Sequence, residues 1–378
     1  MKRIEIVKKI QSYLQTSNGV DQWLWWIFVG LLVGGFFIFL SASIGLLARD
    51  GANFGNVAVM RVVWTGLGIA GAYVASYVHY KYLRRYTLFL LLASILLTAL
   101  VFVPGIGFKH GGAYRWISLF GLSFQPAEFL KIAFVIYTAA FFATIKERVQ
   151  TFTYGLLPLF SLLGIAGFLL LMQPDTDTFV VLFIAMFAMF LTAGAKLRHI
   201  GIILLSGVLA LSILIASKPY LISRIVTFIN PAGDLQGAGY QVRQSLIAIG
   251  SGGFSGKGFG QSVQKFKYLP EPTGDSVFAV AAEEFGFIGG LILIALFLAL
   301  ILRGLRIASR APDMFSGLLS IGIVILIGAS AFMNIASMLA IIPLSGLPLA
   351  FVSHGGTSLV ITLLEAGILL NISRYQKS

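Results

Sequence analysis

The chain has 378 residues, of which 58% are hydrophobic and 11% are charged, and its formal net charge is +13. Soluble domains carry about 25% charged residues, so this composition excludes a soluble protein and predicts an integral membrane protein. The chain contains no cysteine, which excludes disulfides and thiolate metal sites.

Ten stretches of the chain are apolar enough to cross a membrane, for which about 20 residues are needed. They cover residues 23–47, 56–78, 87–104, 125–145, 154–172, 178–194, 200–216, 276–302, 315–340 and 356–372. The sequence therefore predicts an all-α integral membrane protein of about ten transmembrane helices. Residues 1–378 form one polytopic membrane domain in this prediction.

The distribution of Lys and Arg predicts the orientation of these helices. With the N-terminus inside, the cytoplasmic segments hold 16 Lys and Arg residues, whereas the short outer loops hold three. The positive-inside rule then places both termini in the cytoplasm. Inner loops beside anionic lipid account for most of the net positive charge, so nucleic-acid binding is not expected.

A large outer loop, residues 218–275, separates the seventh and eighth predicted helices. It holds ten glycines, six Lys or Arg residues and three carboxylates, a balance that favours an anionic lipid head group as ligand. Apolar residues at 242, 246 and 249 predict a short amphipathic helix at the membrane interface. The Gly-rich stretch around Lys257 could present backbone N–H groups to phosphate or act as a hinge.

Asp275 ends this loop where the eighth apolar stretch begins. Two roles are open to it, and they are compatible. As a helix N-cap it would accept hydrogen bonds from the first free N–H groups. As a general base its pKa would rise on partial burial, while the nearby Lys265 and Lys267 would oppose that rise.

Charged residues inside membrane spans are costly, so they are paired or functional. The predicted spans contain six of them: Arg61, Glu128, Lys131, Glu283, Glu284 and Glu365. Glu128 and Lys131 share a helix face at a spacing of three, either as a neutralised pair or as the lining of a cavity. Glu283 and Glu284 point about 100° apart. One is expected to face a polar cavity and the other to pair with a cation such as Arg61.

Three shorter outer segments contain Pro or Gly at membrane depth: residues 111–117, 173–178 and 343–358. Non-helical backbone at this depth must be satisfied by protein or by a water-lined cavity. Each segment alone is also compatible with ordinary turns. Because all three lie on the outer face, they predict a cavity that opens to the outside.

Several of these segments together resemble the SEDS (shape, elongation, division and sporulation) family of bacterial cell-wall proteins. The resemblance rests on Tyr114-Arg115-Trp116-Ile117, Gln125-Pro126-Ala127-Glu128 with Lys131, Gln173-Pro174-Asp175, Tyr240-Gln241, Gly252-Gly253, Gly256-Lys257-Gly258, Leu269-Pro270-Glu271, Asp275, Glu283-Glu284-Phe285-Gly286, Pro348 and Ser353-His354-Gly355-Gly356-Thr357-Ser358. Residues 260–271 look more like the division (FtsW-like) branch than the elongation (RodA-like) branch. The chain departs from the family pattern at Asp177, where Gly is common, and at His354, where Tyr is usual.

The resemblance implies a peptidoglycan glycosyltransferase in the bacterial inner membrane that polymerises lipid II into glycan strands. Its implied partners are a class B penicillin-binding protein, other divisome or elongasome membrane proteins, and membrane lipids. It also implies that Asp275 is the catalytic residue. The positions that match Arg115, Trp116, Glu128 and Lys131 would lie around the same outer cavity.

The resulting hypothesis is glycosyl transfer with inversion. Asp275 would take the proton from the acceptor hydroxyl, and Arg115, Arg243 and Lys257 would neutralise the leaving diphosphate. Further candidates for substrate binding are Glu283, Ser353 and His354. No resident cofactor or protein metal site is predicted, although a divalent ion, Mg²⁺ or Mn²⁺, could assist. Two alternatives stay open: a lipid II flippase, and a non-catalytic scaffold for a penicillin-binding protein.

Overall fold

The structure is a computed structural model that describes residues 19–48, 54–110, 113–119, 122–230, 233 and 237–377. Ten helices coincide with the ten predicted apolar stretches, which confirms the all-α membrane architecture in its main part. They are α2 (Gln22–Ile44), α3 (Phe54–Tyr77), α5 (Thr87–Leu100), α6 (Pro126–Ile145), α7 (Leu157–Met172), α8 (Thr176–Thr192), α9 (Leu197–Ser217), α12 (Val277–Ser309), α13 (Met314–Met338) and α14 (Gly356–Ser373). Eight described helices are long and apolar enough to cross a membrane, and α5 and α8 are shorter apolar helices.

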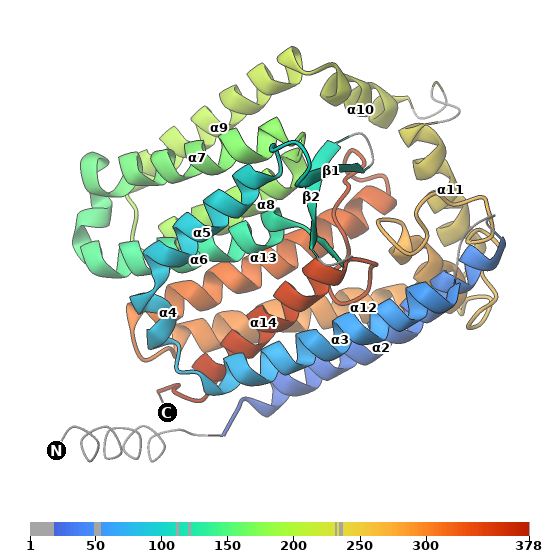
Figure 1. Ribbon diagram of the computed structural model, residues 1–378, viewed down its shortest axis with the longest axis horizontal. Helices are drawn as coiled ribbons and strands as arrows, with labels where there is room; N and C mark the ends of the chain where they lie inside the picture. The colour runs from blue at the N-terminus through green and yellow to red at the C-terminus, as the bar shows by residue number, and fades with distance from the viewer. Residues whose placement is uncertain are drawn as a thin grey trace.

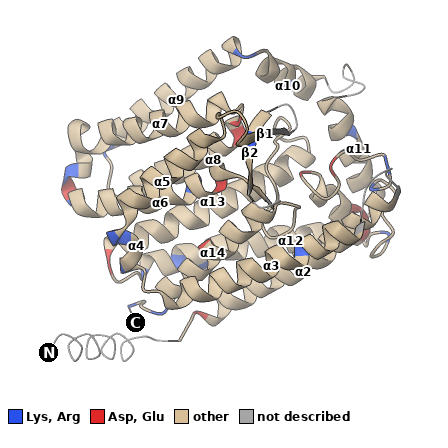
Figure 2. Ribbon diagram, in the orientation of Figure 1, with Lys and Arg blue, Asp and Glu red and all other residues tan. Residues whose placement is uncertain are grey.

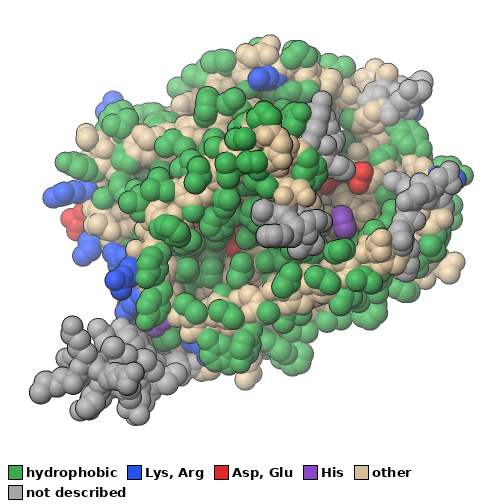
Figure 3. All heavy atoms as spheres, viewed as in Figure 1, with side chains coloured by type: hydrophobic (Ala, Val, Ile, Leu, Met, Phe, Trp, Pro, Cys, Tyr) green, Lys and Arg blue, Asp and Glu red, His purple; other side chains and the backbone are tan. Residues whose placement is uncertain are grey.

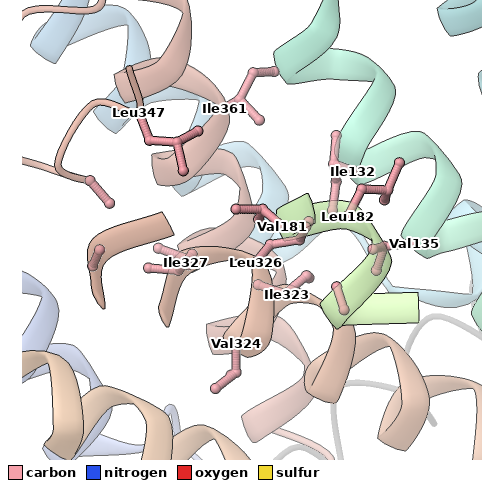
Figure 4. Packing of buried hydrophobic residues seen from close by; sticks show 14 of the residues in the cluster. Ile132, Val135, Val181, Leu182, Ile323, Val324, Leu326, Ile327, Leu347 and Ile361 are labelled. Carbon is pink, nitrogen blue, oxygen red and sulfur yellow. The ribbon is translucent and has the colours of Figure 1, made fainter. Parts of the chain in front are cut away.

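The helices form a bundle around α13, which packs against α12, α8 and α6 (Figure 1). Branched apolar side chains fill the centre, among them Val135 of α6, Val181 of α8 and Ile323 of α13 (Figure 4). Helices α3 and α9 instead leave most of their apolar side chains exposed. Hydrophobic side chains cover much of one face (Figure 3). An apolar exterior of this kind is stable against lipid rather than water.

A small antiparallel sheet lies between α5 and α6, so the prediction of a purely helical chain was incomplete. Its strands are β1 (Gly107–His110), β2 (Ala113–Leu119) and β3 (Leu122–Phe124), in the order β1-β2-β3. Ile117 of β2 is buried, and it pairs with Gly107 on one side and Phe124 on the other. The sheet holds Arg115 and Trp116 on an extended strand. Gly111 and Gly112 lie outside the described residues.

The 218–275 loop contains two helices, α10 (Pro219–Ile229) and α11 (Ala238–Ser251), and the second confirms the predicted short helix. The following Gly-rich stretch lies against α12. The N–H groups of Lys257 and Gly258 donate to the backbone carbonyls of Glu283 and Glu284 on α12. These two hydrogen bonds dock the stretch on α12.

The two ends of the described chain meet at one end of the bundle. Asp21 forms an ion pair with Arg303 at 2.6 Å, and its backbone N–H donates to Ser373. Figure 1 shows the start of α2 and the C-terminus at this end, with α10 and α11 at the other. Lys and Arg gather at the same end as the C-terminus and α4 (Lys81–Arg85) (Figure 2).

Candidate active site

Asp275 lies in a turn directly before α12, and its side chain is half-buried. The predicted N-cap role is wrong, because α12 begins after Ser276 and no side chain caps it. The N–H groups of Gly274 and Ser276 both donate to the carbonyl of Glu271, so the turn is closed by its own backbone. Among the described residues, none donates a hydrogen bond to the Asp275 carboxylate or forms an ion pair with it.

The turn that carries Asp275 is held by α13 and by the α13–α14 connection. Asn334 Nδ2 donates to the carbonyls of Asp275 and Leu347, at 2.8 Å each. Ser353 Oγ donates to the carbonyl of Gly274 at 2.7 Å and accepts the N–H of Leu349. Each bond fixes backbone, so the position of Asp275 is set without using its carboxylate.

Arg61 of α3 supports this connection. The sequence predicted that Arg61 could pair with Glu283 or Glu284, and it pairs with neither. Its guanidinium donates to the carbonyls of Ser353 and Phe351 at 2.7 and 2.6 Å and lies over the ring of Phe39. His354 stacks on the same ring. Burial and the charge of Arg61 hold the pKa of His354 below its usual value, which favours the neutral imidazole.

Burial is the main cause that raises the pKa of Asp275 to about 7. The negative charges of Glu271 and Asp177 raise it further, whereas Arg115 and Arg224 oppose the rise. The sequence predicted that Lys265 and Lys267 would oppose the rise in the pKa of Asp275, but Arg115 and Arg224 do so instead. Lys265 is turned into the protein, where it pairs with a glutamate of α12.

Arg115 reaches the site from β2. Its Nε donates to the carbonyl of Gln173 at 3.0 Å, and Nη2 donates to the carbonyl of Pro174. Burial raises the pKa of the neighbouring Asp175, an effect that Arg115 opposes. Among the described residues, no carboxylate lies within ion-pair distance of Arg115. Its charge is therefore available to an anion.

Arg224 lies on α10, and the sequence did not single it out. It forms an ion pair with Asp177 at 3.0 Å. The same carboxylate accepts the N–H of Gly346 at 3.0 Å. The sequence showed Arg224 only as one of the basic residues of the 218–275 loop. Its pairing could not be predicted, because Asp177 is 47 residues away.

A sequence profile for cell cycle proteins of the FtsW, RodA and SpoVE type matches residues 22–378. The chain belongs to this FtsW/RodA/SpoVE family. Stage V sporulation protein E of Bacillus subtilis is 38% identical over 320 residues, which cover 84% of this chain and 87% of that protein. A probable peptidoglycan glycosyltransferase FtsW of Trichlorobacter lovleyi is 39% identical over 351 residues, or 91% of each chain.

Solved structures of FtsW/RodA/SpoVE proteins share the fold. A chain from a peptidoglycan synthase complex that coordinates polymerization and crosslinking superimposes with a TM-score of 0.76. It is 27% identical, and the match covers 95% of this chain and 99% of that chain. RodA of Thermus thermophilus gives a TM-score of 0.69 at 27% identity over 95% and 98% of the two chains. The resemblance inferred from the motifs is thereby confirmed.

Two further candidate residues of this FtsW/RodA/SpoVE protein are engaged with each other. Lys257 Nζ lies 2.6 Å from Glu283 Oε1, and the Glu283 side chain is buried. Ser262 Oγ and the N–H groups of Val263 and Gln264 also donate to Glu283. The expectation that Glu283 or Glu284 faces a polar cavity was wrong, because the loop folds back over α12 and covers both carboxylates.

The remaining candidates lie on either side of the turn. Arg243 and Gln241 are two residues apart on α11, and Gln241 Nε2 donates to Ser276 Oγ at 2.9 Å, so this helix lies against the turn. Trp116 follows Arg115 on β2 and is half-buried. Among the described residues, no hydrogen bond or ion pair joins the Asp275 carboxylate to Trp116.

The pair of Glu128 and Lys131 occupies an internal site below the α13–α14 connection. The two groups lie 3.1 Å apart, so the predicted pairing on one helix face is present. A cavity beside them is also lined by Glu365, Ser330 and Leu347, and it has room for about one water molecule. The pair is therefore both neutralised and next to a small polar cavity.

The described residues contain no group of three or more His, Cys, Asp or Glu side chains that could hold a metal ion. A metal held by protein side chains alone therefore does not fit this site, and no step of the reaction is assigned to one. Mg²⁺ carried in by a diphosphate needs only one or two carboxylates. A requirement for Mg²⁺ or Mn²⁺ stays a prediction from the sequence.

Proposed function

We propose that this protein is a peptidoglycan glycosyltransferase that polymerises lipid II into glycan strands on the outer side of the membrane. The observation that carries the proposal is the state of Asp275. Its carboxylate is half-buried and accepts no hydrogen bond from any described residue. The positive charges of Arg115 and Arg224 lie close enough to lower its pKa. A relative that matches 91% of the chain is named a probable peptidoglycan glycosyltransferase. The anionic diphosphate of lipid II suits the two guanidinium groups.

In this mechanism Asp275 is the general base. Its carboxylate takes the proton from the 4-hydroxyl of the acceptor sugar while that oxygen attacks the anomeric carbon of the donor. The bond from this carbon to the diphosphate oxygen breaks, and the electron pair leaves with the lipid diphosphate. Because diphosphate leaves without protonation, one carboxylate is sufficient, unlike the pair used by glycoside hydrolases.

The rise in the pKa of Asp275 to about 7 makes its carboxylate a stronger base than an ordinary aspartate. Proton transfer is most effective when the pKa of the base lies near the working pH. Arg115 has no carboxylate partner among the described residues, so it is the first candidate to neutralise the charge that develops on the diphosphate. Asn334 and Ser353 position the turn rather than the substrate.

We also propose a class B penicillin-binding protein as the partner and a cytoplasmic location for both termini. The match to a chain of a peptidoglycan synthase complex supports the partner. The gathering of Lys and Arg at the end of the bundle that holds the C-terminus supports the orientation (Figure 2). In this orientation α10, α11 and Asp275 face outward.

Purified protein in detergent, supplied with labelled lipid II and no partner, tests the proposal. Glycan strands are expected from the native chain, and at least about a 100-fold loss from Asp275→Asn. Asp21→Asn is the matched control, because Asn can still cap α2 at the other end of the bundle. Translocation of lipid II in vesicles without polymer would support a flippase instead, and neither activity would support a scaffold. Parallel reactions with EDTA test the metal requirement.

A further inference from the structure

The ion pair between Arg224 and Asp177 joins three separate segments beside the site. Arg224 Nη1 lies 3.2 and 3.0 Å from the two carboxylate oxygens of Asp177. One of these oxygens also accepts the N–H of Gly346. The pair thus ties α10 of the outer loop to the start of α8 and to the α13–α14 connection. It remains accessible, because the side chains of Arg224 and Asp177 are 27% and 18% exposed.

The pair lies next to the Asp275 carboxylate. A Cβ atom placed on Gly346 would lie 3.7 Å from Oδ2 of Asp275 and 3.9 Å from Oδ2 of Asp177. The two carboxylates therefore both lie within 4 Å of one point. The pKa of Asp275 is raised by the charge of Asp177 and lowered by that of Arg224. Breaking the ion pair between Arg224 and Asp177 would therefore change the pKa of Asp275.

The two guanidinium groups near Asp275 differ in their partners. Arg115 is held by backbone carbonyls, which orient its charge without neutralising it. Arg224 is neutralised by a carboxylate, an anion of the same shape as one face of a phosphate group. Arginine binds carboxylate and phosphate through the same planar fork of N–H donors. A diphosphate that reached Arg115 would carry charge enough to compete for Arg224.

We propose that Arg224 is a ligand of the donor's diphosphate and that Asp177 is a resident anion that occupies Arg224 until the donor arrives. This inference rests on the proposed function and assigns its donor site. The exchange replaces one anion by another on the same guanidinium, so no bond other than hydrogen bonds changes. Released from Arg224, the charge of Asp177 lies uncompensated beside Asp275 and favours a proton there. Donor binding thereby strengthens the base.

The test measures binding without turnover, in full-length protein that carries Asp275→Asn. The probe is undecaprenyl pyrophosphate, compared with undecaprenyl monophosphate. Asp177→Asn keeps an acceptor for the Gly346 N–H and removes only the competing charge, so it should tighten diphosphate binding about two- to fivefold. Arg224→Gln should weaken it about tenfold. In the double variant the effect of Asp177→Asn should vanish, because Arg224 is no longer there to be released.

Two further variants separate binding from structure. Asp21→Asn breaks the Asp21–Arg303 pair at the other end of the bundle and should leave binding unchanged. Arg224→Lys keeps the charge without the fork and should weaken binding less than Arg224→Gln. Melting temperatures establish that each variant is folded.

Three results would overturn the inference. Asp177→Asn could weaken binding as much as Arg224→Gln, its effect could persist without Arg224, or the monophosphate could respond as strongly as the diphosphate. The proposed function is judged separately, by glycan synthesis with Asp275 present. Strands made without the expected binding pattern would reject only the donor site. The binding pattern without strands would reject only the polymerase.

Discussion

Lys265 Nζ lies 2.7 Å from Oε1 of Glu284, and the two side chains are only 0% and 1% exposed. The ammonium group also donates to Ser41 Oγ on α2 and to the carbonyl of Gly260. This buried pair fastens the end of the Gly-rich stretch between the first and eighth spans. It therefore fixes the segment that leads to Asp275.

The Lys265–Glu284 pair is expected to be costly to break and much less costly to replace. Lys265→Met leaves the glutamate buried without its cation and should lower the free energy of unfolding by about 3–5 kcal/mol. The double variant Lys265→Met/Glu284→Leu should recover most of that loss, since both charges are gone. Thermal unfolding in detergent measures both. A double variant no more stable than Lys265→Met would contradict this account.

The pH dependence of polymerisation should report Asp275. The base acts as the carboxylate, so kcat/KM should rise about tenfold per pH unit at low pH and level off above its pKa of about 7. Arg224 lowers the pKa of Asp275, so Arg224→Gln should move the midpoint to higher pH. Asp21→Asn should leave the profile in place. A native profile that is flat between pH 5 and 8 would argue against Asp275 as the base.

The Asp275 carboxylate should also destabilise the folded protein at neutral and higher pH. The pKa of Asp275 in the folded chain is raised to about 7 from the ordinary 3.8. Its contribution to stability is therefore complete below about pH 4 and is lost as pH rises through about 7. Asp275→Asn should be more stable than the native chain at pH 8 by about 1–3 kcal/mol, and equal to it at pH 4. Equal melting temperatures at both pH values would count against the raised pKa.

Asn334 is expected to act by positioning the base. Asn334→Ala removes both hydrogen bonds that tie the Asp275 turn to Leu347. It should lower kcat about 10- to 100-fold, with little change in KM. Asn371→Ala is the matched control. That side chain also bridges two backbone groups, of Tyr80 and Ser76, but at the other end of the bundle. It should lose stability without the loss in kcat.

The membrane spans could be predicted from sequence because each is a local run of apolar residues. The 107–124 sheet could not, since its short strands carry no long alternating pattern between two spans. The partners of the buried charged residues could not be predicted from the sequence either. Glu284 pairs with Lys265 rather than Arg61, and Asp177 pairs with Arg224, 47 residues away. Such pairs depend on how the 218–275 loop folds back over the helices, and a local sequence pattern does not encode that.

A glycine inside α12 makes this folding back possible. Gly286 has φ 64° and ψ −163° within an otherwise helical segment, a combination that is essentially restricted to glycine. The kink lets the N–H groups of Phe287 and Ile288 donate to the carbonyls of Gly253 and Phe254. A Cβ at Gly286 would lie 2.3 Å from the backbone N of Gly256. The backbone strain and the clash fall on the same residue.

Gly286→Ala should therefore undock the Gly-rich stretch. We expect a loss of at least about 3 kcal/mol of stability, together with a loss of polymerisation because the turn of Asp275 loses its support. Gly290→Ala is the matched control one turn further along α12, where the nearest atom to a new Cβ is Cζ of Phe278 at 3.8 Å. That variant should be neutral or gain about 0.5–1 kcal/mol from helix propensity. Unfolding curves and polymerisation rates compare Gly286→Ala with Gly290→Ala. Equal stability and equal activity of the two variants would show that the kink does not hold the loop.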